Sequence, residues 1–92
     1  MTALRRKKDG ARHTGFMYKG PLQDLPMWMN PVVEAGLIKP VTATSPMEVK
    51  IITGKFWPVF ANDWIIVSPT MDCYLIADED LGNVYEIEGV EK

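Results

Sequence analysis

The chain has one cysteine and one histidine, which excludes most of the chemistry that small proteins build from these residues. Cys73 has no partner for an internal disulfide bond, as is typical of proteins in a reducing compartment. His13 and Cys73 supply only two of the roughly four nitrogen or sulfur ligands of a structural zinc site. They are also a poor nucleophile–base pair, because Cys73 lies in an apolar segment typical of a buried thiol. We therefore expect no metal, no cofactor and no enzymatic activity.

Long apolar runs and phosphate-binding loops are also missing. No apolar stretch approaches the roughly 20 residues that a membrane-spanning helix needs. The four cations at 5–8 are not followed by an apolar segment, so a secretory signal is not expected. Gly54 and Gly82 are isolated glycines rather than parts of a glycine-rich loop. The acidic triplet at 78–80 does not match the spacing of an EF-hand, and a solvated turn is the simpler interpretation.

Charge is spread unevenly along the chain. Residues 1–19 hold six cations and one acid, a net charge of +5, whereas residues 20–92 hold four cations and eleven acids, a net charge of −7. This pattern predicts a flexible basic arm at residues 1–10, followed by a single α+β domain at residues 11–92. The candidates for contacts with nucleic acid phosphates are Arg5, Arg6, Lys7, Lys8 and Arg12. Phe16 and Tyr18 offer rings for stacking on bases, while the acidic remainder of the chain opposes such binding.

One short helix is predicted in the region that follows Asp24. Asp24 suits the N-cap, and apolar residues at helical spacing follow it. Pro31 lacks an N–H and clashes with the preceding turn, so the helix must kink or restart there. Gly36 can adopt the left-handed conformation that ends many helices.

Apolar residues at period two predict strands in most of the remaining chain. These strands span residues 14–19, 47–52, 56–60, 64–67, 73–76 and 84–88. Thr53-Gly54-Lys55 predicts a hairpin with a two-residue loop, because Gly54 accepts a positive φ. Pro58 has no ladder donor, which predicts an edge strand or a bulge. The fold class is therefore α+β, with one short kinked helix on a small antiparallel meander sheet of about four to five strands.

The segment Asn62-Asp63-Trp64-Ile65-Ile66-Val67 joins a turn to an apolar strand. Further matching steps follow without a gap at Met71-Asp72, Cys73-Tyr74-Leu75, Leu81 and Tyr85-Glu86. Together they resemble a family of small, mostly uncharacterised proteins of tailed phages and prophages with a Pro-Gly-Asp-Tyr-Gly type signature. The resemblance covers about residues 25–88.

The resemblance implies a phage origin, a compact α+β fold and the cytoplasm of an infected host cell. It carries no catalytic assignment, because the family has none to transfer. Three family glycines correspond to Asn62, Ser68 and Met71 here, and a family proline corresponds to Leu75. Asn62 is suited to a left-handed turn, whereas a left-handed Met71 carries a steric cost.

Large apolar side chains on a predicted edge strand favour a protein contact over chemistry. The candidates for this contact are Phe56, Trp57 and Pro58. We predict a non-enzymatic phage accessory protein that acts through contact with another protein, such as a host factor, or with a second copy of itself. The alternatives are a nucleic-acid-associated accessory protein that uses the basic arm, and a small ligand-binding domain or hydrolase.

Overall fold

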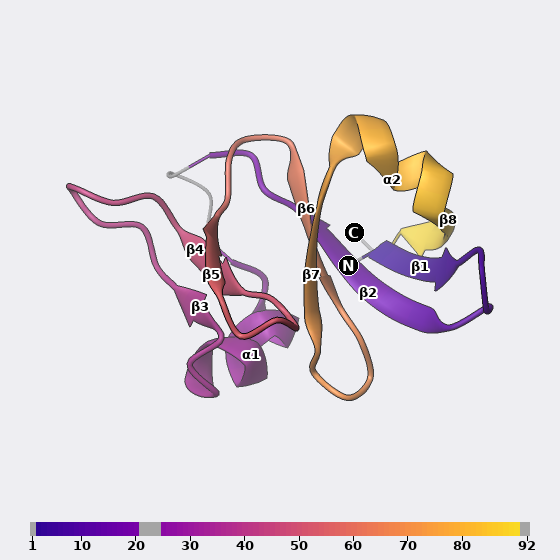
Figure 1. Ribbon diagram of the computed structural model, residues 1–92, viewed down its shortest axis with the longest axis horizontal. Coiled ribbons are helices and arrows are strands. Elements are labelled where there is room, and N and C mark those ends of the chain that lie inside the picture. Colours follow the sequence, from indigo (N-terminus) through magenta and orange to yellow (C-terminus); the bar gives the residue numbers. More distant parts are fainter. Residues whose placement is uncertain (1, 21–24, 91–92) are drawn as a thin grey trace.

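A five-stranded antiparallel sheet runs through the computed structural model, which describes residues 2–20 and 25–90 (Figure 1). Its strands, in the order in which they pair, are β7 (Cys73–Ala77), β6 (Asp63–Val67), β2 (Arg12–Met17), β1 (Thr2–Arg6) and β8 (Tyr85–Val90). A second sheet consists of β3 (Ile38–Lys39), β4 (Glu48–Lys50) and β5 (Phe56–Pro58). The helical segments are the 3-10 helix η1 (Met27–Met29), α1 (Asn30–Glu34) and α2 (Asp78–Val84). The predicted α+β class is confirmed.

The strand order departs from a simple meander. After the β1–β2 hairpin, β2 pairs next with β6, and the chain segment between them forms α1 and the whole three-stranded sheet. The last strand, β8, returns to pair with β1. These pairings join segments that are far apart in the sequence, so the local apolar pattern contained no information about them.

The prediction of a flexible arm at residues 1–10 is wrong for residues 2–6. These residues form β1, which lies between β2 and β8 inside the five-stranded sheet. Leu4 is completely buried and anchors the strand, while Arg5 next to it is exposed on the opposite face. One apolar residue among several charges was too weak a pattern to predict a strand, but the partners on both sides complete its backbone hydrogen bonds.

The predicted helix is shorter than expected and begins as a 3-10 turn. Asp24, the predicted N-cap, lies outside the described residues. Pro31 lies in the first turn of α1, where its missing N–H removes no intrahelical bond, so the predicted restart is confirmed. Gly36 follows the helix with a φ of 77°, as predicted for a left-handed stop.

The turns follow the predicted residues with one change of length. The β4–β5 hairpin has a three-residue loop rather than a two-residue one, because the Ile51 N–H donates to the Lys55 carbonyl (3.0 Å). Gly54 supplies the positive φ in this loop, at 87°. Asn62 and Met71 are the non-glycine residues with positive φ, at 74° and 66°, in the part of the chain described here. Met71 thus holds the left-handed conformation despite its steric cost.

Two apolar cores lie on opposite faces of the five-stranded sheet. Ile65 and Val67 of β6 face the core beneath the three-stranded sheet and α1, whereas Trp64 and Ile66 face the core beneath α2. Figure 1 shows α1 and the small sheet on one side of the molecule and α2 on the other. The Trp64 indole N–H donates to Asp78 Oδ1 (2.8 Å), which ties the start of α2 to the sheet. This arrangement leaves β7 and β8 as the two edges of the larger sheet.

Candidate protein-contact site

The two sheets have four edge strands, and three of them carry features that hinder pairing with another chain. β3 has only two residues, one of which is Lys39. β5 contains Pro58, which has no N–H to donate. β8 carries Glu86 and Glu88, both exposed. Short length, proline and charge are the usual means by which proteins protect sheet edges.

The fourth edge strand, β7, has none of these protections. Its five residues, Cys-Tyr-Leu-Ile-Ala, include no charge, no proline and no glycine. An uncharged apolar edge strand of this length is a typical site for pairing with a further strand. Among the edges of the described structure, β7 is therefore the one suited to an added strand.

The register of β6 and β7 shows which backbone groups of β7 point outward. The Ser68 N–H donates to the Asp72 carbonyl (2.9 Å), which makes this a hydrogen-bonded pair. Hydrogen-bonded and non-bonded pairs alternate along an antiparallel ladder, so Cys73, Leu75 and Ala77 are in the non-bonded class. Their N–H and C=O groups therefore point away from β6. The C=O of Ala77 accepts the first bond of α2, because Ala77 is the N-cap of that helix. Within residues 2–20 and 25–90, no backbone hydrogen bond joins the other outward groups to another element.

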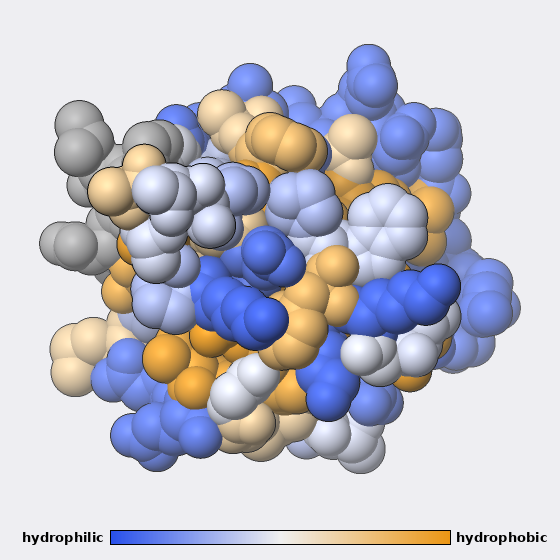
Figure 2. Space-filling model, turned by 60° about the vertical axis from the view of Figure 1, so that its left-hand side comes forward, coloured by the Kyte–Doolittle hydropathy of each residue, from blue (hydrophilic) through white to orange (hydrophobic). Residues whose placement is uncertain are grey.

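A cleft of about 300 Å³ lies between this strand and the β4–β5 hairpin. We call it the β5–β7 cleft; it is lined by Ile51, Ile52, Trp57, Cys73, Tyr74 and Leu75. The side chains of Ile52 and Trp57 are 61% and 50% exposed, so the hairpin wall of the cleft presents large apolar groups to solvent. Figure 2, turned toward the side that carries the small sheet, shows hydrophobic surface between hydrophilic residues on this face. The cleft combines free backbone groups with apolar contact area.

Of the three residues predicted for a protein contact, one lines this cleft. The expected edge position of β5 is confirmed, and Trp57 is the central residue of this strand. Phe56 is half-buried, and its ring lies 4.2 Å from the Lys39 ammonium. Pro58 pairs with Glu48 of β4. Sequence reasoning missed the contribution of β7, because only the order of strands in the sheet identifies β7 as an edge. The lack of charged residues in this segment was visible in the sequence.

The predicted nucleic acid residues do not form a free basic stripe. Arg5 forms an ion pair with Glu86, and the Lys7 ammonium donates to the Gly82 carbonyl. Arg12 lies 3.9 Å from a carboxylate oxygen of Glu88.

Arg6 is held by a bidentate pair with Asp9, at 2.8 and 3.1 Å. This pair lowers the pKa of the Asp9 carboxyl to about 2. Lys8 lies exposed in the turn after β1. Four of the five cations thus already have partners within the chain, with which phosphate groups would have to compete.

The two aromatic residues proposed for base stacking both contribute to the core. Tyr18 is 5% exposed and belongs to the core beneath the small sheet, and Phe16 packs against the same core. Arg5 and Arg6 also point to opposite faces of the sheet, since successive strand residues alternate. The stacking hypothesis is therefore wrong for Tyr18, and for Phe16 it stays a prediction.

His13 and Cys73 lie on opposite faces of the five-stranded sheet. The imidazole of His13 is buried between the rings of Tyr74 and Tyr85, with centroids 5.6 and 5.5 Å away. Cys73 is buried in the other core, and burial raises the pKa of its thiol to about 11. The backbone of the sheet separates the two side chains, so they do not form a nucleophile–base pair. Among the described residues, no three metal-ligating side chains gather in one place.

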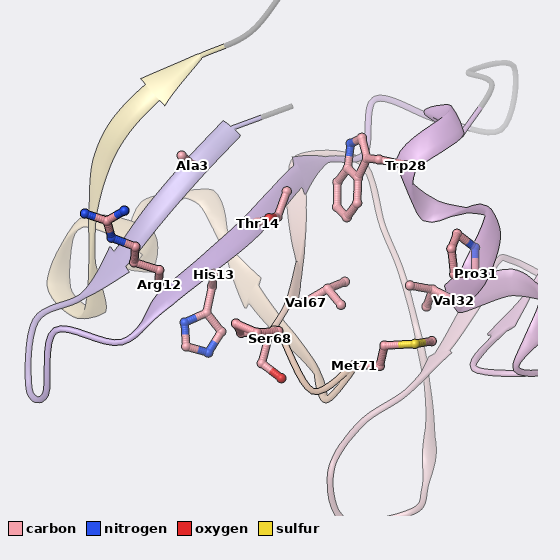
Figure 3. A pocket seen from close by; sticks show the side chains of 11 residues that line it. Ala3, Arg12, His13, Thr14, Trp28, Pro31, Val32, Val67, Ser68 and Met71 are labelled. Carbon is pink, nitrogen blue, oxygen red and sulfur yellow. The ribbon is translucent and has the colours of Figure 1, made fainter.

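A larger hollow, which sequence reasoning missed, lies between α1 and the five-stranded sheet. This Trp28 groove has a volume of about 570 Å³ (Figure 3). Figure 3 shows Trp28, Val32, Val67 and Met71 around it, whereas the Arg12 side chain extends toward β8 and away from it. Its lining is mainly apolar, so it suits an apolar group and offers no set of converging polar groups for catalysis.

Comparison of the chain with protein-family models, with curated proteins and with solved structures finds no match. None of the helices in the described residues is long and apolar enough to cross a membrane.

Proposed function

We propose that this protein is a small binding protein that contacts another protein through the outer edge of β7 and the β5–β7 cleft. The observation that carries the proposal is the contrast between β7 and the other three edges. β7 offers the outward N–H groups of Cys73, Leu75 and Ala77 and the outward C=O groups of Cys73 and Leu75, with no charge or proline to block them. Trp57 and Ile52 add exposed apolar area beside those groups, and aromatic residues are frequent energetic centres of protein interfaces.

The other hypotheses have less support. A basic arm for nucleic acid would need free cations, but four of the five candidates are engaged with partners. A hydrolase would need converging catalytic groups, and the lone histidine and cysteine are buried on opposite sides of the sheet. The resemblance to phage proteins supports a phage accessory role with a host factor as partner, and this part of the proposal rests on the sequence alone.

Two substitutions test the proposal without disturbing the cores. Ala77 has a φ of −69°, which suits proline, and its N–H points outward, so Ala77→Pro removes a free donor while the internal ladder keeps its bonds. Trp57→Ala removes half-exposed apolar area from the cleft. Ile87→Ala is the matched control, because Ile87 is 56% exposed on β8, at the opposite edge.

Each variant is immobilised and used to capture proteins from a lysate of the source cells, with quantification by mass spectrometry. We expect the same captured protein with the wild type and Ile87→Ala, and at least fivefold less with Ala77→Pro and Trp57→Ala. Circular dichroism establishes that all four proteins are folded. Equal capture by all four proteins would refute the proposed site, and recovery of nucleic acid with no protein would favour the basic-arm alternative.

A further inference from the structure

Carboxylates bound the outer edge of β7, most densely where the strand ends. Asp72 precedes the strand and the acidic triplet 78–80 follows it, and all four residues are exposed. One oxygen of Asp78 accepts from the Trp64 indole, whereas no hydrogen bond involves the carboxylates of Glu79 and Asp80 among the described residues. Between them the five residues of β7 span roughly 17 Å at about 3.4 Å per residue and carry no charge. The end at 78–80 has three carboxylates and the end at Asp72 has one, so the end at 78–80 is the more negative of the two. A strand added here meets an apolar stretch and then a concentration of negative charge.

This charge pattern disfavours a second copy of the chain as the occupant. In an antiparallel pairing of two β7 strands centred on Leu75, Asp72 of one copy lies opposite Asp78 of the other. In a parallel pairing, each acidic end lies beside the same acidic end of the second copy. Like charges opposite one another destabilise strand pairs, so either arrangement carries a penalty.

We infer that the occupant is an extended segment of another protein, with apolar residues at alternate positions and a basic residue at the end beside 78–80. This inference rests on the proposed function and adds the chemistry of the partner. Antiparallel pairing matches the rest of the sheet and is slightly more stable than parallel pairing. In an antiparallel pairing, the basic residue lies on the N-terminal side of the apolar stretch in the partner segment. Alternate side chains then face the β5–β7 cleft, whose volume equals that of roughly ten water molecules.

The structure assigns a distinct role to each part of the site. The added ladder uses the outward N–H groups of Cys73, Leu75 and Ala77 and the C=O groups of Cys73 and Leu75. These backbone bonds do not depend on which side chains the partner carries. Trp57 and Ile52 select apolar side chains, because a charged group placed between them would lose its hydration. The carboxylates at 78–80 select the direction and charge of the segment, and salt screens this last contribution.

The test uses two synthetic peptides that differ only in charge. Both have the pattern Val-Thr-Val-Thr-Val with blocked ends, and one begins with two lysines while the other begins with two glutamates. Each peptide is titrated to millimolar concentration into the 15N-labelled full chain, and amide shifts of Cys73, Leu75 and Ala77 report binding. We expect the lysine peptide to bind at least fivefold more tightly, and Ala77→Pro to weaken both peptides by about five- to tenfold.

Two charge variants isolate the role of the acidic end. Asp80→Asn removes one carboxylate beside the site and is expected to weaken the lysine peptide by about two- to fivefold. Glu88→Gln removes the same charge from β8, at the opposite edge of the sheet, and is expected to leave both peptides unchanged.

The remaining outcomes separate this inference from the proposed function. Equal binding of the two peptides, with both weakened by Ala77→Pro, would overturn the basic segment and leave the β7 contact standing. Absence of amide shifts with either peptide, while capture from lysate still depends on Ala77, would overturn the extended segment. A dimer seen by analytical ultracentrifugation and abolished by Ala77→Pro would assign the edge to a second copy and overturn the inference as well.

Discussion

Gly15→Ala is expected to destabilise the protein, although it adds only one methyl group. Gly15 lies on β2 beneath the α2 side of the sheet, and a Cβ built on it would lie 2.6 Å from Leu4 Cδ1 and 3.1 Å from a ring carbon of Trp64. Carbon atoms in contact normally lie about 3.5–4.0 Å apart, so the first contact is too short by roughly 1 Å. Leu4 is completely buried, and the bond to Asp78 holds the Trp64 indole. Neither neighbour can therefore move aside freely.

The magnitude follows from two opposing effects. Overpacking of a buried site typically costs about 1–3 kcal/mol, while replacing a strand glycine returns about 0.5–1 kcal/mol through the entropy of the unfolded chain. The difference between these ranges is about 0–2.5 kcal/mol, and because both neighbours are held in place we expect a net loss of about 1–2 kcal/mol in the free energy of unfolding. In a chain of 92 residues this lowers the melting temperature by roughly 5–15 °C.

Urea unfolding followed by tryptophan fluorescence measures this effect, and Gly82→Ala provides the control. Gly82 lies in α2 with no atom within 4 Å of an added Cβ, so its substitution is expected to stabilise the protein by about 0.5–1 kcal/mol. Adding Leu4→Val removes the clashing Cδ1, so the double variant should lose less stability than the two single changes summed. A Gly15→Ala protein as stable as the wild type would refute the packing argument.

Three further predictions concern titratable groups. Arg6 lowers the pKa of Asp9 from 3.8 to about 2, so the stability that this pair contributes is present above about pH 4 and lost as the pH falls toward 2. Between pH 4 and pH 2, the melting temperature of Asp9→Asn should therefore fall less than that of the wild type. Burial raises the pKa of Cys73 to about 11, so a thiol reagent at pH 8 should modify this residue only when the protein is unfolded in urea. Rapid reaction of the native protein would contradict the burial of Cys73. Asp78→Ala should cost about 1–3 kcal/mol in urea unfolding, because the part-buried Trp64 N–H loses its acceptor, whereas Asp78→Asn should retain most of that stability.

Local backbone constraints were predictable from the sequence because they act between near neighbours. Gly36 and Gly54 have the positive φ values that turns require, and Pro31 lies where a helix begins. Pro58 lies on an edge strand, as its missing N–H demands. Asn62 begins the turn into β6 with a left-handed backbone, and the strand after it supplies residues to both cores.

Half of the candidate site was also visible in the sequence. Trp57 stood out as a large aromatic residue beside a proline, and it lines the β5–β7 cleft. The other half, Leu75 and its neighbours on β7, has an apolar sequence that suits a central strand as well as an edge strand. The choice depends on whether a partner strand arrives from elsewhere in the chain, which a local pattern does not contain.

The sequence by itself determined the α+β class, most of the strands and the main turns, since hydrophobic period and backbone stereochemistry are local properties. Only the tertiary structure decided that residues 2–6 form an inner strand, that Arg5 is paired with Glu86, and that β7 remains an unprotected edge. Each of these depends on pairing across long stretches of chain, where the entropy of loop closure is balanced against burial and hydrogen bonding summed over the whole fold.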